Sequence, residues 1–228
     1  MNPRQHTYYT LIASLPFLPR FDKARRLPIT LERLEARMSM LVQEDAEAAR
    51  VAMNFLWWER QPVDRTDKEV ISFYKHIMTF VHQPTLRNII EFQMTLRTIL
   101  AALRRRHRNF SIPSRGTPWG IAPWVGHIER NWNDENFKLP PLFPWVTEVR
   151  HLLETEETLE LQKCIMHLSW NYLDQLTEGQ YFTFDVFLTY LFKWDLLNRW
   201  VLYNKHNAIS RFEKLTMETL GEYNRVFA

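Results

Sequence analysis

Glycine is scarce in this chain, with 5 residues in 228, against an average usage of about 7%. Three of the five, Gly116, Gly120 and Gly126, lie between residues 109 and 145, too far apart to form a glycine-rich loop. Clustered glycines let a backbone wrap around phosphate groups in Rossmann-type and P-loop folds. Their scarcity argues against both folds, and also against an all-β chain with many tight turns.

Cysteine is rarer still, because Cys164 is the only one. A single cysteine excludes a disulfide framework and a cysteine-based metal site within one chain. Cys164 falls in the apolar, helix-like run 159–172. We expect it to be a small buried side chain.

Long uninterrupted apolar runs are also missing. The most apolar segment, 184–203, contains four charged residues, which is too many for a lipid-facing helix of about 20 residues. Residues 8–15 are apolar, but prolines follow them and no A-x-A cleavage site is present, so they make a poor signal peptide. We therefore expect a cytoplasmic protein.

What the chain does have is apolar residues at helical spacing along most of its length. Thr30 is a suitable N-cap, Thr66 and Glu69 form a capping box, and Pro84 suits a first helical turn. Residues 1–29 are expected to be irregular or short and extended. The expected helices are 31–41, 44–59, 66–81, 84–106, 145–153, 156–176, 184–203 and 208–226, with a short one within 121–132.

The pattern predicts an all-α protein, a multi-helix bundle in one or two lobes. Residues 109–145 differ from the rest, because prolines, glycines and tryptophans replace the periodic apolar residues. We interpret 109–145 as a Pro/Trp-rich connection between an N-terminal helical lobe, 1–108, and a C-terminal helical lobe, 146–228.

No motif predicts catalysis. The eight histidines are scattered, without an H-E-x-x-H pattern, and no serine lies in G-x-S-x-G. The acidic residues 44–47 suit a helix start better than a metal loop, and His151 with Glu154 suits an ordinary helix surface. We expect no enzyme, no metal and no cofactor; a site assembled only in three dimensions is the alternative.

The strongest polar feature is a run of arginines at the end of helix 84–106. Arg97, Arg104 and Arg108 share one helical stripe. Solvent exposure or pairing within the chain is the simplest interpretation; contact with an acidic protein is the second, and nucleic acid or anionic lipid the third. Trp119 and Trp124 are either core residues or interface anchors. The candidate partner-binding residues are Arg97, Arg104, Arg105, Arg106, Arg108, Trp119 and Trp124.

Two stretches carry a family resemblance. The first is Tyr8–Pro16, followed by Pro28–Glu32, a helix and Asp45. The second comprises Phe182–Asp185, Tyr190–Lys193, Arg199, Trp200 and Phe212. Together they resemble an uncharacterised bacterial family whose genes accompany V-type ATPase subunits and whose members begin with Tyr-Tyr-x-Leu-x-Ala-x-Leu-Pro.

That family is distantly similar to the C-type component of V/A-type ATPases, which is named d in eukaryotes. The resemblance implies an all-helical funnel that lies between the central shaft and the membrane ring and has no catalytic residues. This chain is shorter than a full C-type component, so at least one helical unit should be missing.

The resemblance predicts a non-catalytic subunit or an accessory or assembly factor of a V/A-type ATPase. Its partners would be the central shaft and the membrane ring, and it would reach the inner face of the membrane only through them. The alternatives are a helical interaction or regulatory protein unrelated to ATPases, and a basic nucleic-acid-binding helical protein.

Overall fold

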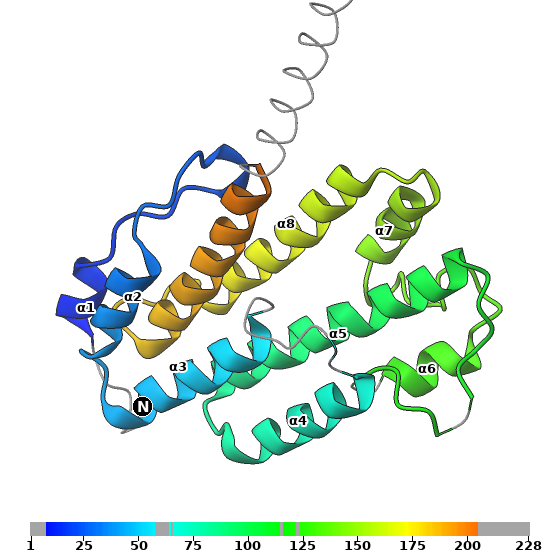
Figure 1. The fold of residues 1–228 in the computed structure, drawn as a ribbon, viewed down its shortest axis with the longest axis horizontal. Helices are drawn as coiled ribbons and strands as arrows, with labels where there is room; N and C mark the ends of the chain where they lie inside the picture. The colour runs from blue at the N-terminus through cyan, green and yellow to red at the C-terminus, as the bar shows by residue number, and fades with distance from the viewer. Residues whose placement is uncertain (1–7, 58–63, 65, 115, 122–123, 205–228) are drawn as a thin grey trace, which may run out of the picture.

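The computed structural model describes residues 8–57, 64, 66–114, 116–121 and 124–204. These residues form helices and connecting loops without a β-sheet, which confirms the all-α prediction (Figure 1). The elements are α1 (Tyr9–Ala13), the 3-10 helix η1 (Phe21–Lys23), α2 (Leu31–Met38), α3 (Gln43–Leu56), α4 (Asp67–Phe80), α5 (Pro84–His107), α6 (Trp124–Arg130), α7 (Trp145–Glu154), α8 (Thr158–Leu176) and a further helix over 184–204.

Local sequence signals set several helix starts. Thr66 and Glu69 form the predicted capping box of α4: the Thr66 backbone N–H donates to Glu69 Oε2 at 2.7 Å, and the Glu69 N–H donates to Thr66 Oγ1 at 3.3 Å. Thr30 accepts from the Arg33 N–H at the start of α2. Pro84 occupies the first turn of α5, where its missing N–H costs no hydrogen bond.

Helix α5 runs through the middle of the molecule (Figure 1). Its first half, with Leu86 and Ile90, belongs to a core that also includes α2, α3 and helix 184–204. Its second half, with Ile99 and Leu103, belongs to another core with α6 and α7. Because α8 also contributes to both cores, two long helices join them.

The predicted lobe boundaries at 108 and 146 stay a prediction. The segment between them is partly helical, since α6 falls inside it, and Phe137 and Leu139 from this segment are completely buried in the second core. The last predicted helix, 208–226, lies outside the described residues.

The N-terminal region differs from the expected irregular or extended chain. Residues 9–13 are helical, and the segment after them packs against helix 184–204. Phe21 is fully buried, with its ring centroid 5.4 Å from that of Trp200. Within the described residues, no helix combines the length and apolar character that crossing a bilayer requires.

Candidate interaction surfaces

The arginines at the end of α5 have different environments. Arg104 and Arg108 are exposed, whereas Arg97, Arg105 and Arg106 are half-buried. The Arg97 guanidinium donates to the carbonyl oxygen of Leu56 at 3.0 Å, and it therefore caps the end of α3. The structure does not gather the five arginines into one exposed patch.

Arg106 binds the loop that follows α6. Its Nη1 donates to the carbonyl oxygens of Trp132, at 2.5 Å, and of Asp134, while Nη2 donates to that of Asn133 at 3.4 Å. The guanidinium also lies 5.7 Å from the centre of the buried Phe137 ring. Arg106 is therefore a structural cation that fixes a loop 26 to 28 residues away.

Arg105 makes shorter-range contacts. Its guanidinium lies 5.7 Å from the Phe110 ring centre, and Nη2 approaches the Ser111 carbonyl oxygen at 3.5 Å. These contacts hold the chain where it leaves α5. Arg104 and Arg108 are left as the candidate residues that reach solvent.

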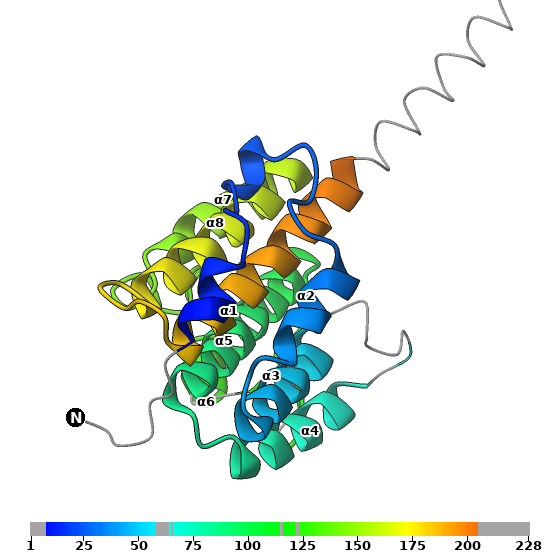
Figure 2. The same cartoon turned by 90° about the vertical axis from the view of Figure 1, so that its left-hand side faces the viewer.

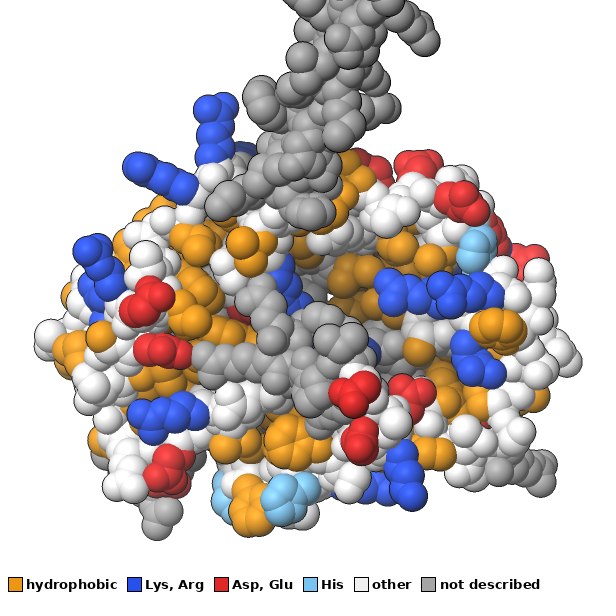
Figure 3. Space-filling model, in the orientation of Figure 1, with side chains coloured by type: hydrophobic (Ala, Val, Ile, Leu, Met, Phe, Trp, Pro, Cys, Tyr) orange, Lys and Arg blue, Asp and Glu red, His pale blue; other side chains and the backbone are white. Residues whose placement is uncertain are grey.

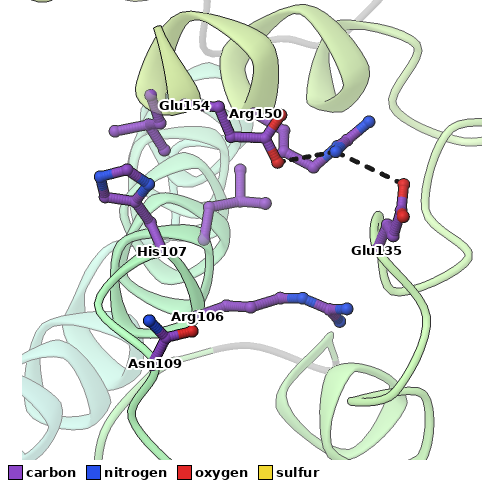
Figure 4. A pocket seen from close by; sticks show the side chains of 8 residues that line it. Arg106, His107, Asn109, Glu135, Arg150 and Glu154 are labelled. Carbon is purple, nitrogen blue, oxygen red and sulfur yellow. Dashed lines mark hydrogen bonds and ion pairs between the residues drawn. The ribbon is translucent and has the colours of Figure 1, made fainter. Parts of the chain in front are cut away.

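A polar cavity of about 330 Å³ lies between the end of α5, α7 and the loop after α6 (Figure 4). Arg150 crosses it, with Nη1 2.7 Å from a Glu154 oxygen and 3.4 Å from a Glu135 oxygen, and Nε donating to Asn136 Oδ1 at 3.0 Å. Both arginines of the cavity, Arg106 and Arg150, are thus engaged by the protein itself. The cavity tethers the loop to α7 and offers an anion little unpaired charge.

The two candidate tryptophans pack within the molecule. Trp119 is only 7% exposed, and its indole N–H donates to Glu129 Oε1 at 2.9 Å. Trp124 is half-buried, and its ring meets Phe143 edge-on at 4.9 Å. Both belong to the second core or pack against it.

Groups with reactive chemistry are few in the described residues. Burial raises the pKa of the Cys164 thiol to about 11, with the Glu148 charge adding to the effect. The thiol is therefore protonated at neutral pH and is a weak nucleophile. Within the described ranges, no three His, Cys, Asp or Glu side chains are grouped to hold a metal ion.

An exposed aromatic surface, which the sequence alone did not reveal, lies at one side of the molecule. It consists of Tyr9 on α1 and of Tyr181 and Phe182 in the turn before helix 184–204, and we call it the aromatic patch. Tyr9 is 62% and Tyr181 75% exposed, and the Tyr9 and Phe182 ring centroids are 4.8 Å apart. Figure 2 faces the side of the molecule that carries α1 and this turn.

Hydrogen bonds fix the segments under the patch. The Tyr8 N–H donates to the Phe182 carbonyl oxygen at 2.6 Å, and the Tyr8 hydroxyl donates to Asp45 Oδ2 at 2.5 Å. Burial, followed by the bond to Asp45, raises the pKa of Tyr8 well above its ordinary value. Tyr8 is therefore a neutral donor that ties α1 both to the turn and to α3.

The two stretches that carry the family resemblance meet at this side of the molecule. The Tyr190 hydroxyl donates to the Pro16 carbonyl oxygen at 2.9 Å, and the Trp194 indole N–H donates to the Ile29 carbonyl oxygen at 2.8 Å. Residues more than 160 positions apart thus form one packed unit.

A second cavity, of about 400 Å³, opens beside Pro16, between the loop after α1, α8 and helix 184–204. Phe17, Trp170 and Tyr190 contribute its apolar walls. Lys193 lies at its edge, 5.6 Å from the Trp170 ring centre and paired with Asp174. The cavity is therefore largely apolar, with a neutralised charge at one end.

Comparison with known proteins gives one match. Residues 58–220 match the model of the family described as "Protein of unknown function (DUF2764)". No curated protein matches the chain, and no solved structure does. The match covers more than half of the sequence and confirms the expected uncharacterised family. The chain belongs to the DUF2764 family of proteins of unknown function.

Proposed function

We propose that this protein is a non-catalytic accessory subunit or assembly factor of a V/A-type ATPase and acts by protein contact. The proposal starts from the resemblance of Tyr8–Pro16 and Phe182–Trp200 to a family encoded with such ATPases. Its chemistry would belong to other subunits, and its own task would be to hold parts of the complex together.

One observation supports the proposal more than any other. The two resembling stretches, which lie at opposite ends of the chain, pack together through Tyr8, Tyr190 and Trp194. A family motif that forms one unit in space is a stronger candidate for a shared role than two unrelated stretches.

The aromatic patch lies on this unit and suits a protein contact. Tyrosine and phenylalanine bury much apolar area at a low conformational cost, and aromatic residues are enriched at the centres of protein interfaces. Tyr9 and Tyr181 are the residues we expect to contribute most to binding. Arg104 and Arg108 are distant from the patch in sequence and remain candidates for a separate, charge-based contact.

A nucleic-acid-binding role is less favoured by the arginines of α5. Arg97 and Arg106 donate to carbonyl oxygens of the protein, so they are not available as phosphate contacts. Two exposed arginines, Arg104 and Arg108, would neutralise too few phosphates for strong binding.

Affinity purification tests the proposal. The full chain, tagged and expressed in its native host, should retain V/A-type ATPase subunits after mild detergent extraction. A Tyr9→Ser/Tyr181→Ser variant should lose most of them. The matched control is Phe80→Ser, which replaces an aromatic residue that is 64% exposed on α4. Purification of the wild-type chain without any ATPase subunit would refute the proposal.

A further inference from the structure

The loop that joins α1 to α2 concentrates positive charge. Residues 17–26, which we call the basic loop, contain four cations and one carboxylate, and all five side chains are exposed: Arg20, Asp22, Lys23, Arg25 and Arg26. Their formal charge of +3 equals that of the whole chain. The remaining residues are therefore electrically balanced, and the net charge of the protein is concentrated in this loop. Figure 3 shows Lys and Arg side chains projecting over this part of the molecule.

Phe17 projects from the same loop. It is 85% exposed, the highest value among the large apolar side chains of the described residues. Pro16 and Pro19 restrict the backbone on both sides of it, and the Pro16 carbonyl oxygen is held by the Tyr190 hydroxyl at 2.9 Å. Leu18 packs against the first core. The loop is thus fixed while Phe17 remains in water.

Buried residues of the loop direct its cations outward. Phe21 and Ala24 are buried in the first core, and they alternate with the exposed Lys23, Arg25 and Arg26. Arg20 is placed by a hydrogen bond from Nη2 to His167 Nδ1 at 2.7 Å and by Asp22, 3.8 Å away. The fold therefore presents the charges on one supported segment.

We propose that the basic loop binds an anionic lipid surface, with Phe17 entering the boundary between headgroups and acyl chains. Stable attachment to a membrane requires an apolar insertion together with a polybasic segment, and the loop has both. A headgroup layer also suits cations that are spread along a loop, because it offers negative charge without demanding a fixed geometry. A protein partner would instead need carboxylates matched to each position.

This inference goes beyond the proposed function and does not depend on it. Direct lipid contact differs from attachment through partner subunits. It requires a property of this chain alone, which purified protein can show without any ATPase present.

Vesicle sedimentation with the full purified chain tests the lipid contact. The protein should sediment with vesicles of equal parts phosphatidylcholine and phosphatidylglycerol, and should remain in solution with pure phosphatidylcholine. Added salt should release it, because counterions screen exposed charges. Each cation removed from the loop should lower the affinity about fivefold.

Two pairs of variants separate the loop from general charge and general hydrophobicity. Arg25→Ala/Arg26→Ala should weaken binding and flatten its salt dependence, whereas Arg104→Ala/Arg108→Ala, which removes the same charge from α5, should not. Phe17→Ser should weaken binding about tenfold at every salt concentration, whereas Phe80→Ser should not. Circular dichroism should confirm that all four variants are folded.

Two results would overturn the inference. One is no sedimentation of the wild-type chain with anionic vesicles at low salt. The other is equal weakening by the α5 variant and the loop variant, which would mean nonspecific adsorption. Loss of a protein partner by Arg25→Ala/Arg26→Ala, without any vesicle binding by the wild type, would assign the loop to an acidic protein surface and also reject the lipid contact.

Discussion

At the scale of single residues, Gly120 is required by its close neighbour Thr98. A Cβ at position 120 would lie 2.6 Å from Thr98 Cγ2 and 3.0 Å from Val125 Cγ2. The Thr98 hydroxyl accepts from the Ile121 N–H at 2.9 Å inside the core, so Thr98 has little freedom to move. Gly120→Ala should therefore lower the free energy of unfolding by about 1–3 kcal/mol, measured by urea denaturation.

The variant Thr98→Ser provides the control for this contact. Serine keeps the hydroxyl that binds Ile121 but lacks the Cγ2 methyl group that the new Cβ would meet. Gly120→Ala should cost less free energy in the Thr98→Ser background than in the wild type. Strictly additive costs would show that the methyl contact is not the cause.

Cys164 is a residue whose environment predicts its reactivity. Burial raises the pKa of its thiol to about 11, from an ordinary value of 9.0. Raising the pKa lowers the thiolate fraction at pH 8, so iodoacetamide should alkylate the folded protein at least about tenfold more slowly than the protein unfolded in urea. The rate should increase as the pH approaches 11. Equal rates in the folded and unfolded protein at pH 8, measured by mass spectrometry, would contradict this environment.

At the scale of elements, the end of α5 shows how neighbouring arginines differ. Arg106 donates to three carbonyl oxygens of the loop after α6, while Arg104 is exposed. Hydrogen bonds from a charged donor stabilise more than neutral ones, so Arg106→Ala should cost about 2 kcal/mol of unfolding free energy. The matched variant Arg104→Ala should change it by less than about 0.5 kcal/mol. Similar costs for both, in the same denaturation assay, would remove the structural role of Arg106.

Helix starts could be predicted where the signal is local in the chain. The capping box of Thr66 and Glu69 and the first-turn Pro84 act through the nearest turn, so the sequence itself contains both partners. Helix α1 could not be predicted in this way. Its preceding residue, Tyr8, makes no side-chain cap and is held instead by Phe182, far away in sequence.

The candidate surfaces were harder to predict for the same reason. The sequence groups Arg104, Arg105 and Arg106, but it does not show that Arg106 is held by carbonyl oxygens of a distant loop. It also gives no sign that Phe17 is exposed, because an aromatic residue beside leucines is ordinarily expected in a core. Exposure depends on tertiary contacts, here the bond from Tyr190 to the Pro16 carbonyl oxygen.

At the scale of the whole molecule, α5 and α8 connect the two cores. Since each helix contributes buried residues to both cores, we expect one cooperative unfolding transition. Leu103→Ala, in the second core, should cost about 2–5 kcal/mol and lower amide protection in α3 as well as in α7. Hydrogen exchange with mass spectrometry measures both helices. Loss of protection confined to α7 would indicate two independent lobes, as the predicted division at 109–145 implies.

The central claim is that this protein works by contact with a V/A-type ATPase through the aromatic patch. A photo-crosslinking phenylalanine analogue placed at Tyr181 tests it in the native host, with the same analogue at Phe80 as the control. The proposal predicts crosslinks from position 181 to a V/A-type ATPase subunit, identified by mass spectrometry, and none from position 80. Crosslinks from position 181 only to proteins outside the ATPase, or equal ATPase crosslinks from both positions, would contradict it.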